Sequence, residues 1–382
     1  MKRSRSGLLL IAVALVLSMS LGYYVMAAKE PIKIGLQAPI TGPWAYEGEM
    51  ARNCVQIVVD EVNKAGGLLG RPVEIVLGDD QGSPKQSALV AQRMVSDKVV
   101  AVVGTYGSSI NDPASAIYER AELVNIGYGS TAEKLTEQGR KYFFRTCFRD
   151  DKQGAFFATF AVDKLKAKRV AIIHDNTTFG KGLAEAARRP IVEQKKAEIV
   201  FYDAITPGER DFTAILLNMN KQNPDVVYFT GYYSEAGLII RQMRTLGIKA
   251  TFVGGNAAVN DEFVKIAGLN MAAGALQTQE PLPTDLDYPQ SKTFLAEYIR
   301  RHKEPPSSPW PVYAADAFKA IAAAIQGSGS TDSKVLMNYL RNSLKDYPGI
   351  TGPISFDAIG DREGAIYLAY EVTADGKFVP LR

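Results

Sequence analysis

Residues 169–182 read RVAIIHDNTTFGKG, and their pattern indicates the fold class. Residues 169–174 form a short run rich in Val and Ile, which predicts a buried strand. A polar turn follows, and residues 180–194 then show the pattern of an amphipathic helix. A strand that leads directly into a helix is the repeating unit of helix-covered parallel sheets, so the stretch predicts an α/β protein.

The same unit repeats on both sides of this stretch. Around it, the pattern predicts strands 199–205, 226–229 and 251–253 and helices 153–165, 212–221 and 236–246. An earlier series predicts strands 32–37, 73–77, 99–103 and 123–126 and helices 48–64, 84–97 and 113–121. Two successive series predict two doubly wound lobes, each with a parallel sheet and helices on both faces.

The last part of the chain is less regular. It shows helical patterns at 288–302, 313–326 and 333–343, followed by two strands expected to pair as a hairpin, 354–357 and 365–373. Three helices and a hairpin do not make a third core. We therefore expect these segments to complete the two lobes, which requires several crossings and makes the connection a hinge.

The beginning of the chain differs in composition from the rest. Three basic residues among the first five precede an apolar run that extends to about residue 26, and Ala27 and Ala28 follow. This arrangement is typical of a secretory signal, so we expect residues 1–28 to be removed on export. An uncleaved membrane anchor is the alternative, because the apolar run approaches the roughly 20 residues that span a bilayer.

The charge of the remaining chain is balanced. The whole sequence has 44 Lys and Arg and 41 Asp and Glu. Residues 1–28 hold three of the basic residues and no acid, which leaves 41 of each sign. Proteins that bind nucleic acids usually present a basic face, so no nucleic-acid partner is expected.

The sequence offers little for redox, metal or catalytic chemistry. Cys54 and Cys147 are far apart, and we expect two unpaired, partly buried thiols, although export would permit a disulfide. Only His174 and His302 could add to them, so neither a metal site nor a cofactor is expected. There is no Gly-x-Ser-x-Gly elbow, P-loop or dinucleotide fingerprint, and the sequence therefore indicates a protein that is not an enzyme.

Two turns that follow predicted strands suit a carboxylate. Ser108 and Thr131 come shortly after glycines, at positions where a strand gives way to a helix. Free backbone N–H groups at a helix start attract an anion, and each hydroxyl can add a donor. Helix capping is the alternative for either residue taken singly. Aromatic residues at the same loop ends would wall a small-molecule pocket: Trp44, Tyr46, Tyr106, Tyr128, Phe179, Tyr232 and Trp310.

Motifs spread over the whole chain carry a family resemblance. They are Gly42-Pro43, Asp79-Asp80 before Pro84-Lys85, Val102-Val103-Gly104 before Ser108-Ser109, Thr131-Ala132, IIHD at 172–175 with FGKG at 179–182, ITPGERDF at 205–212, Gly231-Tyr232 and GPISFD at 352–357. In this order the motifs resemble those of the branched-chain amino-acid-binding proteins of ABC importers. These proteins have the type I periplasmic-binding fold, in which two doubly wound lobes are joined by a multi-crossing hinge.

The resemblance implies lobes, boundaries and site residues. Lobe 1 would comprise 30–148 plus 281–349, and lobe 2 would comprise 149–280 plus 350–382. Ser108 and Thr131 would hold a ligand carboxylate, while Gly129 would take part of the ammonium through its backbone. The full set of expected ligand-binding residues is Tyr46, Glu47, Gly107, Ser108, Gly129, Ser130, Thr131, Phe179, Tyr232 and Asn256.

Two positions depart from the family pattern. The family usually places an acid after the strand that ends at residue 255, where it pairs the ammonium, but this chain has Asn256. Glu47 stands where an aromatic or small residue is common. Either Glu47 supplies the missing charge, or the ligand lacks an ammonium and is an aromatic or aliphatic carboxylate or a small amide. An amino acid is the preferred interpretation.

The expected role follows from the resemblance and the export signal. The chain would be the monomeric, periplasmic or otherwise extracytoplasmic solute-binding component of an ABC uptake transporter. It would bind a branched-chain or other hydrophobic amino acid by hinge closure and present it to the membrane permease. A ligand sensor and an enzyme that uses the interlobe cleft are the alternatives from other functional classes.

Overall fold

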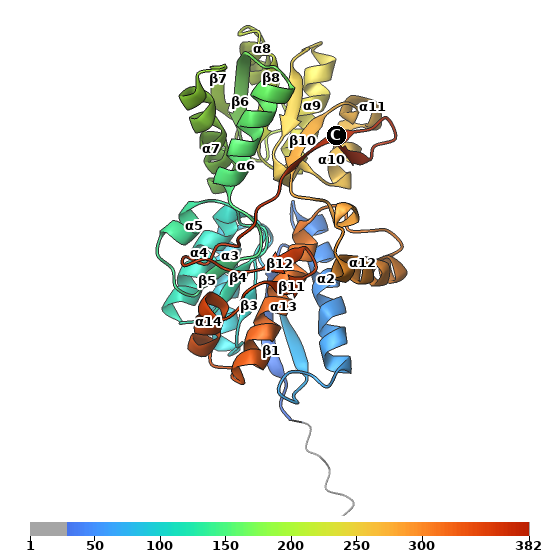
Figure 1. Cartoon of the computed structure of the whole chain (residues 1–382). Coiled ribbons are helices and arrows are strands. Elements are labelled where there is room, and N and C mark those ends of the chain that lie inside the picture. The colour runs from blue at the N-terminus through green and yellow to red at the C-terminus, as the bar shows by residue number, and fades with distance from the viewer. Residues whose placement is uncertain (1–28, 382) are drawn as a thin grey trace, which may run out of the picture.

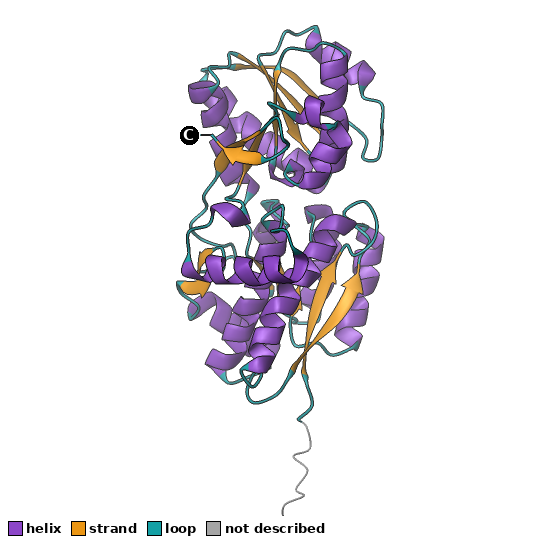
Figure 2. Cartoon of the chain, turned by 90° about the vertical axis from the view of Figure 1, so that its right-hand side faces the viewer, coloured by secondary structure: helices purple, strands orange, loops and turns teal. Residues whose placement is uncertain are grey.

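The computed structural model describes residues 29–381, and the predicted export signal at 1–28 lies outside this part of the chain. The described residues form two lobes, one above the other in Figure 1, with the first residues at the bottom of the lower lobe. Figure 2 shows strands enclosed by helices in each lobe. No helix in the described part is long and apolar enough to cross a membrane.

The first lobe is built on a five-stranded sheet in the order β2-β1-β3-β4-β5, with every pair parallel. Its strands are β1 (Ile32–Ala38), β2 (Val73–Asp79), β3 (Val102–Val103), β4 (Asn125–Gly127) and β5 (Phe143–Arg145). The helices are α2 (Ala45–Lys64), α3 (Pro84–Ser96), α4 (Ser108–Arg120), α5 (Lys134–Glu137), α12 (Pro289–His302), α13 (Trp310–Ser328) and α14 (Ser333–Asn342). Because α2 packs on α13 and α3 packs on α4, two helical layers enclose the sheet.

The second lobe contains a seven-stranded sheet in the order β14-β13-β10-β9-β8-β6-β7. Its parallel strands are β6 (Arg169–His174), β7 (Glu198–Ala204), β8 (Val226–Thr230), β9 (Thr251–Gly254) and β10 (Leu276–Gln279). The helices are α6 (Asp150–Thr159) with a π-helical end at Phe160–Lys164, α7 (Thr178–Gln194), α8 (Thr213–Asn220), α9 (Tyr233–Thr245), α10 (Asp261–Ala267) and α11 (Leu269–Ala272). The predicted class, two doubly wound α/β lobes with a multi-crossing connection, is confirmed.

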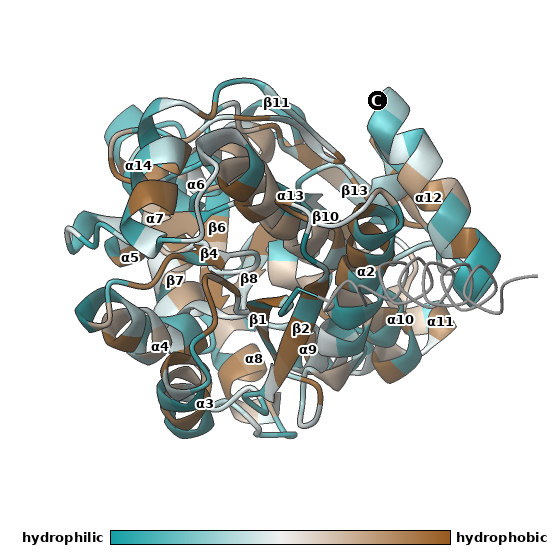
Figure 3. Ribbon diagram, turned by 90° about the horizontal axis from the view of Figure 1, so that it is seen from below, coloured by the Kyte–Doolittle hydropathy of each residue, from teal (hydrophilic) through white to brown (hydrophobic). Residues whose placement is uncertain are grey.

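The core of each lobe lies between its sheet and its helices. In β6 every residue except the first is buried, as its apolar sequence predicted. The helix α13 is buried along most of its length because it is apolar on nearly all sides and lies between the sheet and other helices. Seen from below, strands in the interior are brown and the outer turns of the helices are largely teal (Figure 3).

The predicted C-terminal hairpin is wrong. The strand β12 (Gly352–Ile354) pairs with β11 (Tyr347–Gly349), and not with the later strand. The strand β13 (Leu368–Val372) instead joins the second sheet, where it pairs antiparallel with β10 and with β14 (Phe378–Pro380). The two expected strands separate because the chain passes from the lower lobe to the upper lobe between them (Figure 1).

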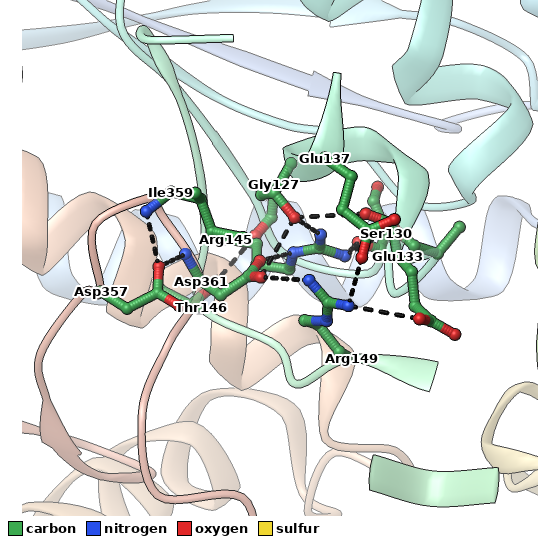
Figure 4. A network of polar contacts seen from close by, with 12 residues as sticks. Gly127, Ser130, Glu133, Glu137, Arg145, Thr146, Arg149, Asp357, Ile359 and Asp361 are labelled. Carbon is green, nitrogen blue, oxygen red and sulfur yellow. Dashed lines mark hydrogen bonds and ion pairs between the residues drawn. The ribbon is translucent and has the colours of Figure 1, made fainter. Parts of the chain in front are cut away.

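A buried polar network fixes the last crossing to the first lobe (Figure 4). Asp361 pairs with Arg145 at 2.5 Å, at the end of β5, and with Arg149 at 3.0 Å. The neighbouring Arg362 donates to the backbone oxygens of Thr146 and Gly352. The lobe boundary near Ile350 stays a prediction; because of this network, we propose that the chain leaves the first lobe after Arg362.

Candidate functional site

The candidate site lies where the two lobes face each other. The loop after β1 and the loop after β8 meet there: Trp44 stacks on Tyr232 with ring centroids 4.1 Å apart. Close by, the Tyr233 hydroxyl donates to the Pro43 carbonyl oxygen at 2.9 Å. The structure therefore has the lobes in contact at the carboxyl ends of their strands, which is where open α/β sheets bind ligands.

The first predicted turn lies at the start of the helix α4. Ser108 is its first residue and is fully buried, and Gly107 before it has a φ of 87°, a conformation that favours glycine. The Ser108 Oγ accepts from the Ala132 N–H at 3.2 Å, so its own proton is free to be donated. The Gly107 N–H donates to the Gly129 oxygen at 2.7 Å, which holds the two predicted turns side by side.

Some polar groups of the second predicted turn already form hydrogen bonds to other residues of the protein. The Ser130 hydroxyl donates to the Thr105 oxygen at 2.8 Å and accepts from Asn111 at 2.9 Å. Thr131 is buried, and its carbonyl oxygen accepts from the Asp150 N–H at 3.0 Å. Ser130 therefore has a structural role inside the lobe, whereas Thr131 lies where the first lobe meets the start of α6.

Several buried aromatic groups at the site have an unused polar atom. The hydroxyls of Tyr106, Tyr128 and Tyr232 and the Nε1 of Trp310 have no hydrogen-bond partner within residues 29–381. The rings of Tyr106 and Tyr232 are 5.8 Å apart, and those of Tyr106 and Trp310 are 6.1 Å apart. Phe179 packs against Tyr232 at 5.3 Å. Because buried polar atoms normally have partners, this cluster indicates a place for a small molecule or water.

The two predicted residues at the start of α2 belong to a different contact between the lobes. The Glu47 carboxylate accepts from Asn260 at 2.9 Å and from Ser308 at 2.6 Å. Burial raises the pKa of Glu47 to about 7. Tyr46 is half-buried, and its hydroxyl donates to Asp261 at 3.4 Å. Both Glu47 oxygens are thus already engaged by residues of the protein.

Two buried carboxylates that the sequence did not single out lie at the hinge. Asp150 begins α6, and Glu280 directly follows β10; both side chains are fully buried. Asn256, at the end of β9, donates its amide to the Glu280 carboxylate at 3.2 and 3.4 Å. The available signal was that both acids lie beside predicted lobe boundaries, at 148/149 and at 280/281.

Other features of the described chain lie elsewhere. A cavity of about 540 Å³ is lined by residues such as Phe148, Tyr313 and Arg362 and includes neither of the two turns. Both Cys54 and Cys147 are buried and free. Within residues 29–381 no cluster of potential metal ligands is present.

Comparison with known proteins identifies the family to which this chain belongs. Residues 31–377 match the family described as periplasmic binding protein. The chain is 33% identical over 351 residues to a Leu/Ile/Val-binding protein homolog of Brucella abortus, which covers 91% of this chain and 92% of the relative. It is 34% identical over 378 residues to the leucine-specific-binding protein of Salmonella typhimurium, with 98% of each chain covered.

A solved structure of a similar protein also superposes on this chain. The branched-chain amino acid transporter substrate-binding protein LivJ of Streptococcus pneumoniae, in complex with isoleucine, superposes with a TM-score of 0.81. It is 30% identical, and the match covers 92% of this chain and 100% of that chain.

Proposed function

Because the chain belongs to the periplasmic binding protein family, we propose that it is the extracytoplasmic solute-binding component of an ABC uptake transporter. The ligand would be a branched-chain or other hydrophobic amino acid, held between the lobes and presented to the membrane permease. The names of the relatives, which include leucine- and Leu/Ile/Val-binding proteins, support this ligand class. The export signal expected at 1–28 supports a periplasmic or similar location for a monomeric mature protein.

One observation carries the proposed binding mode. Ser108 and Thr131 are buried at adjacent turns of the first lobe, and Tyr232 of the second lobe lies over the same region with an unused hydroxyl. Hydroxyl donors and free helix N–H groups suit the ligand carboxylate, while the aromatic rings suit an apolar side chain. The ligand would stabilise the closed form only through contacts that the open form lacks.

Direct binding measurements test this proposal. We expect amino acids such as L-leucine to raise the melting temperature of the mature protein, with heat of binding in a calorimetric titration. Ser108→Ala should weaken binding about 10- to 100-fold, because a hydrogen bond to a charged group contributes about 1.5–3 kcal/mol. Ser96→Ala is the matched control, since Ser96 is exposed at the end of α3.

Two outcomes would contradict the proposal. If no amino acid or related carboxylate stabilises the protein, the transport role in its proposed form is wrong. If the ligand is recovered chemically changed after incubation, the chain is an enzyme that uses the cleft.

A further inference from the structure

The neutral residue at position 256 raises the question of what balances a ligand ammonium. Glu47 was one candidate, but its two oxygens already accept from Asn260 and Ser308. The hinge provides another. Asp150 and Glu280 both enter the interlobe region from crossings of the chain, at the start of α6 and at the end of β10.

The Asp150 carboxylate is buried without a cation bonded to it. Its side chain is fully buried, and within residues 29–381 neither oxygen has an ion-pair partner or a well-formed hydrogen bond. The Thr131 hydroxyl is near enough to lower the pKa of Asp150. Its backbone N–H donates to Thr131, so the residue borders the turn proposed to hold the ligand carboxylate. Burial, Asp175 and Asp150 raise the pKa of Tyr232.

The Glu280 carboxylate is held by neutral groups. It accepts two hydrogen bonds from the Asn256 amide nitrogen, at 3.2 and 3.4 Å. Turning the Gln279 amide lets its nitrogen donate to the same carboxylate at 3.2 Å. The Asn256 Oδ1 is buried and has no partner within the described residues, so it presents an acceptor.

The arginines of the hinge are committed elsewhere. Arg145 and Arg149 both pair with Asp361 (Figure 4). Arg362 donates to several backbone oxygens and lies 3.8 Å from Asp316. Burying a carboxylate without a neighbouring cation costs free energy, and burying an ammonium without a neighbouring anion does so as well.

The free-energy cost of burying these two carboxylates raises their pKa values. Burial raises the pKa of Asp150 to about 7 and that of Glu280 to about 8. The Thr131 hydroxyl and Arg145 lower the pKa of Asp150, but not enough to reverse this rise. Asp150 also raises the pKa of Glu280, so a positive charge between them would relieve both burial and repulsion.

We propose that Asp150, Asn256 and Glu280 form the pole of the interlobe site that receives the ligand's ammonium group, with Glu280 supplying the charge that Asn256 lacks. An ammonium group has three N–H donors. The matching acceptors here are the carboxylates of Asp150 and Glu280 and the Oδ1 of Asn256. This inference rests on the proposed function and narrows its ligand to one that carries both a carboxylate and an ammonium.

The test compares L-leucine with 4-methylpentanoate, which is the same molecule without its amino group. Wild-type protein should bind leucine more tightly. Glu280→Gln keeps the shape of the side chain and should weaken leucine binding by at least about tenfold, the loss expected for a charged hydrogen bond. It should change 4-methylpentanoate binding less than twofold. Calorimetric titration of both ligands gives the two ratios.

Matched variants separate charge from packing. Glu235→Gln removes another buried carboxylate of the second lobe, one that accepts from Ser234 and from the Gly208 N–H at 3.1 Å. It should leave the preference for leucine unchanged. Asn256→Glu added to Glu280→Gln returns the charge to the neighbouring strand and should recover part of the leucine affinity.

Each outcome decides a different point. Unchanged leucine binding in Glu280→Gln overturns this inference and leaves the transport role intact. A wild-type preference for 4-methylpentanoate also overturns it and indicates a carboxylate ligand without an ammonium. If wild-type protein binds neither ligand nor any other amino acid, the proposed function fails and this inference fails with it.

Discussion

At the residue scale, Gly129 shows how closely the two turns are packed. A Cβ atom added there would lie 2.5 Å from Cδ2 of the Tyr106 ring. Tyr106 is itself buried against Trp44 and Tyr232. The absence of a side chain at position 129 therefore allows the aromatic wall of the site to approach the second turn.

Gly129→Ala should damage both stability and binding. The added methyl group must push the Tyr106 ring away, and overpacking of this kind costs about 1–3 kcal/mol. We expect a lower melting temperature and weaker leucine binding, both measured on the purified mature protein. An unchanged melting temperature would mean that the ring moves freely and that the site is less tightly packed than described.

At the element scale, the last crossing depends on one buried carboxylate. Asp361 accepts from Arg145, Arg149 and the Thr136 hydroxyl, and so ties the segment before β13 to β5 and α5. Asp361→Asn would leave Arg145 buried with its charge unpaired. Breaking a buried pair in this way costs about 3–5 kcal/mol, which denaturant unfolding should detect. Asp375→Asn, at an exposed turn, should leave the unfolding curve nearly unchanged.

Elements whose patterns are local could be predicted from the sequence. The strand β6 was predicted with its observed bounds, and the helix α3 within one residue, because an apolar run and a proline at a helix start are local signals. The helix α4 begins five residues before the predicted start at Pro113. Pro113 lies inside this helix as its sixth residue, where it only removes one backbone N–H donor, so it did not mark the true beginning.

Features set by contacts between distant segments could not be predicted. The partner of β13 depends on where the chain crosses between the lobes, which no local pattern encodes. Asp150 and Glu280 look like ordinary surface acids in the sequence, and only the packing of the hinge buries them. Ser108 and Thr131 could be selected because strand-to-helix turns in α/β sheets have a recognisable sequence, but their proposed ligand contacts stay a prediction.

At the scale of the whole molecule, three buried carboxyl groups link closure to pH. Burial raises the pKa of Glu47 and Asp150 to about 7 and that of Glu280 to about 8 in this closed arrangement. At Glu47, hydrogen bonds from Asn260 and Ser308 oppose the rise and nearby Asp261 adds to it. At Asp150, the Thr131 hydroxyl and Arg145 oppose the rise, while Glu133 and Asp151 add to it. Opening of the lobes would return these groups to water, where carboxyl pKa values are about 4.

The sign of the effect follows from proton binding. The closed form holds these protons more tightly than the open form, so its advantage is complete below about pH 4 and is lost as the pH rises through about 7–8. Ligand-free protein should therefore be more open at pH 8 than at pH 5, seen as a larger radius of gyration in small-angle X-ray scattering. With leucine bound, its ammonium offsets the charges of Asp150 and Glu280, and the radius should stay small at both values. A ligand-free radius that does not change with pH would mean that these carboxyls stay buried when the lobes separate, which would place them in the core of a lobe and away from the ligand.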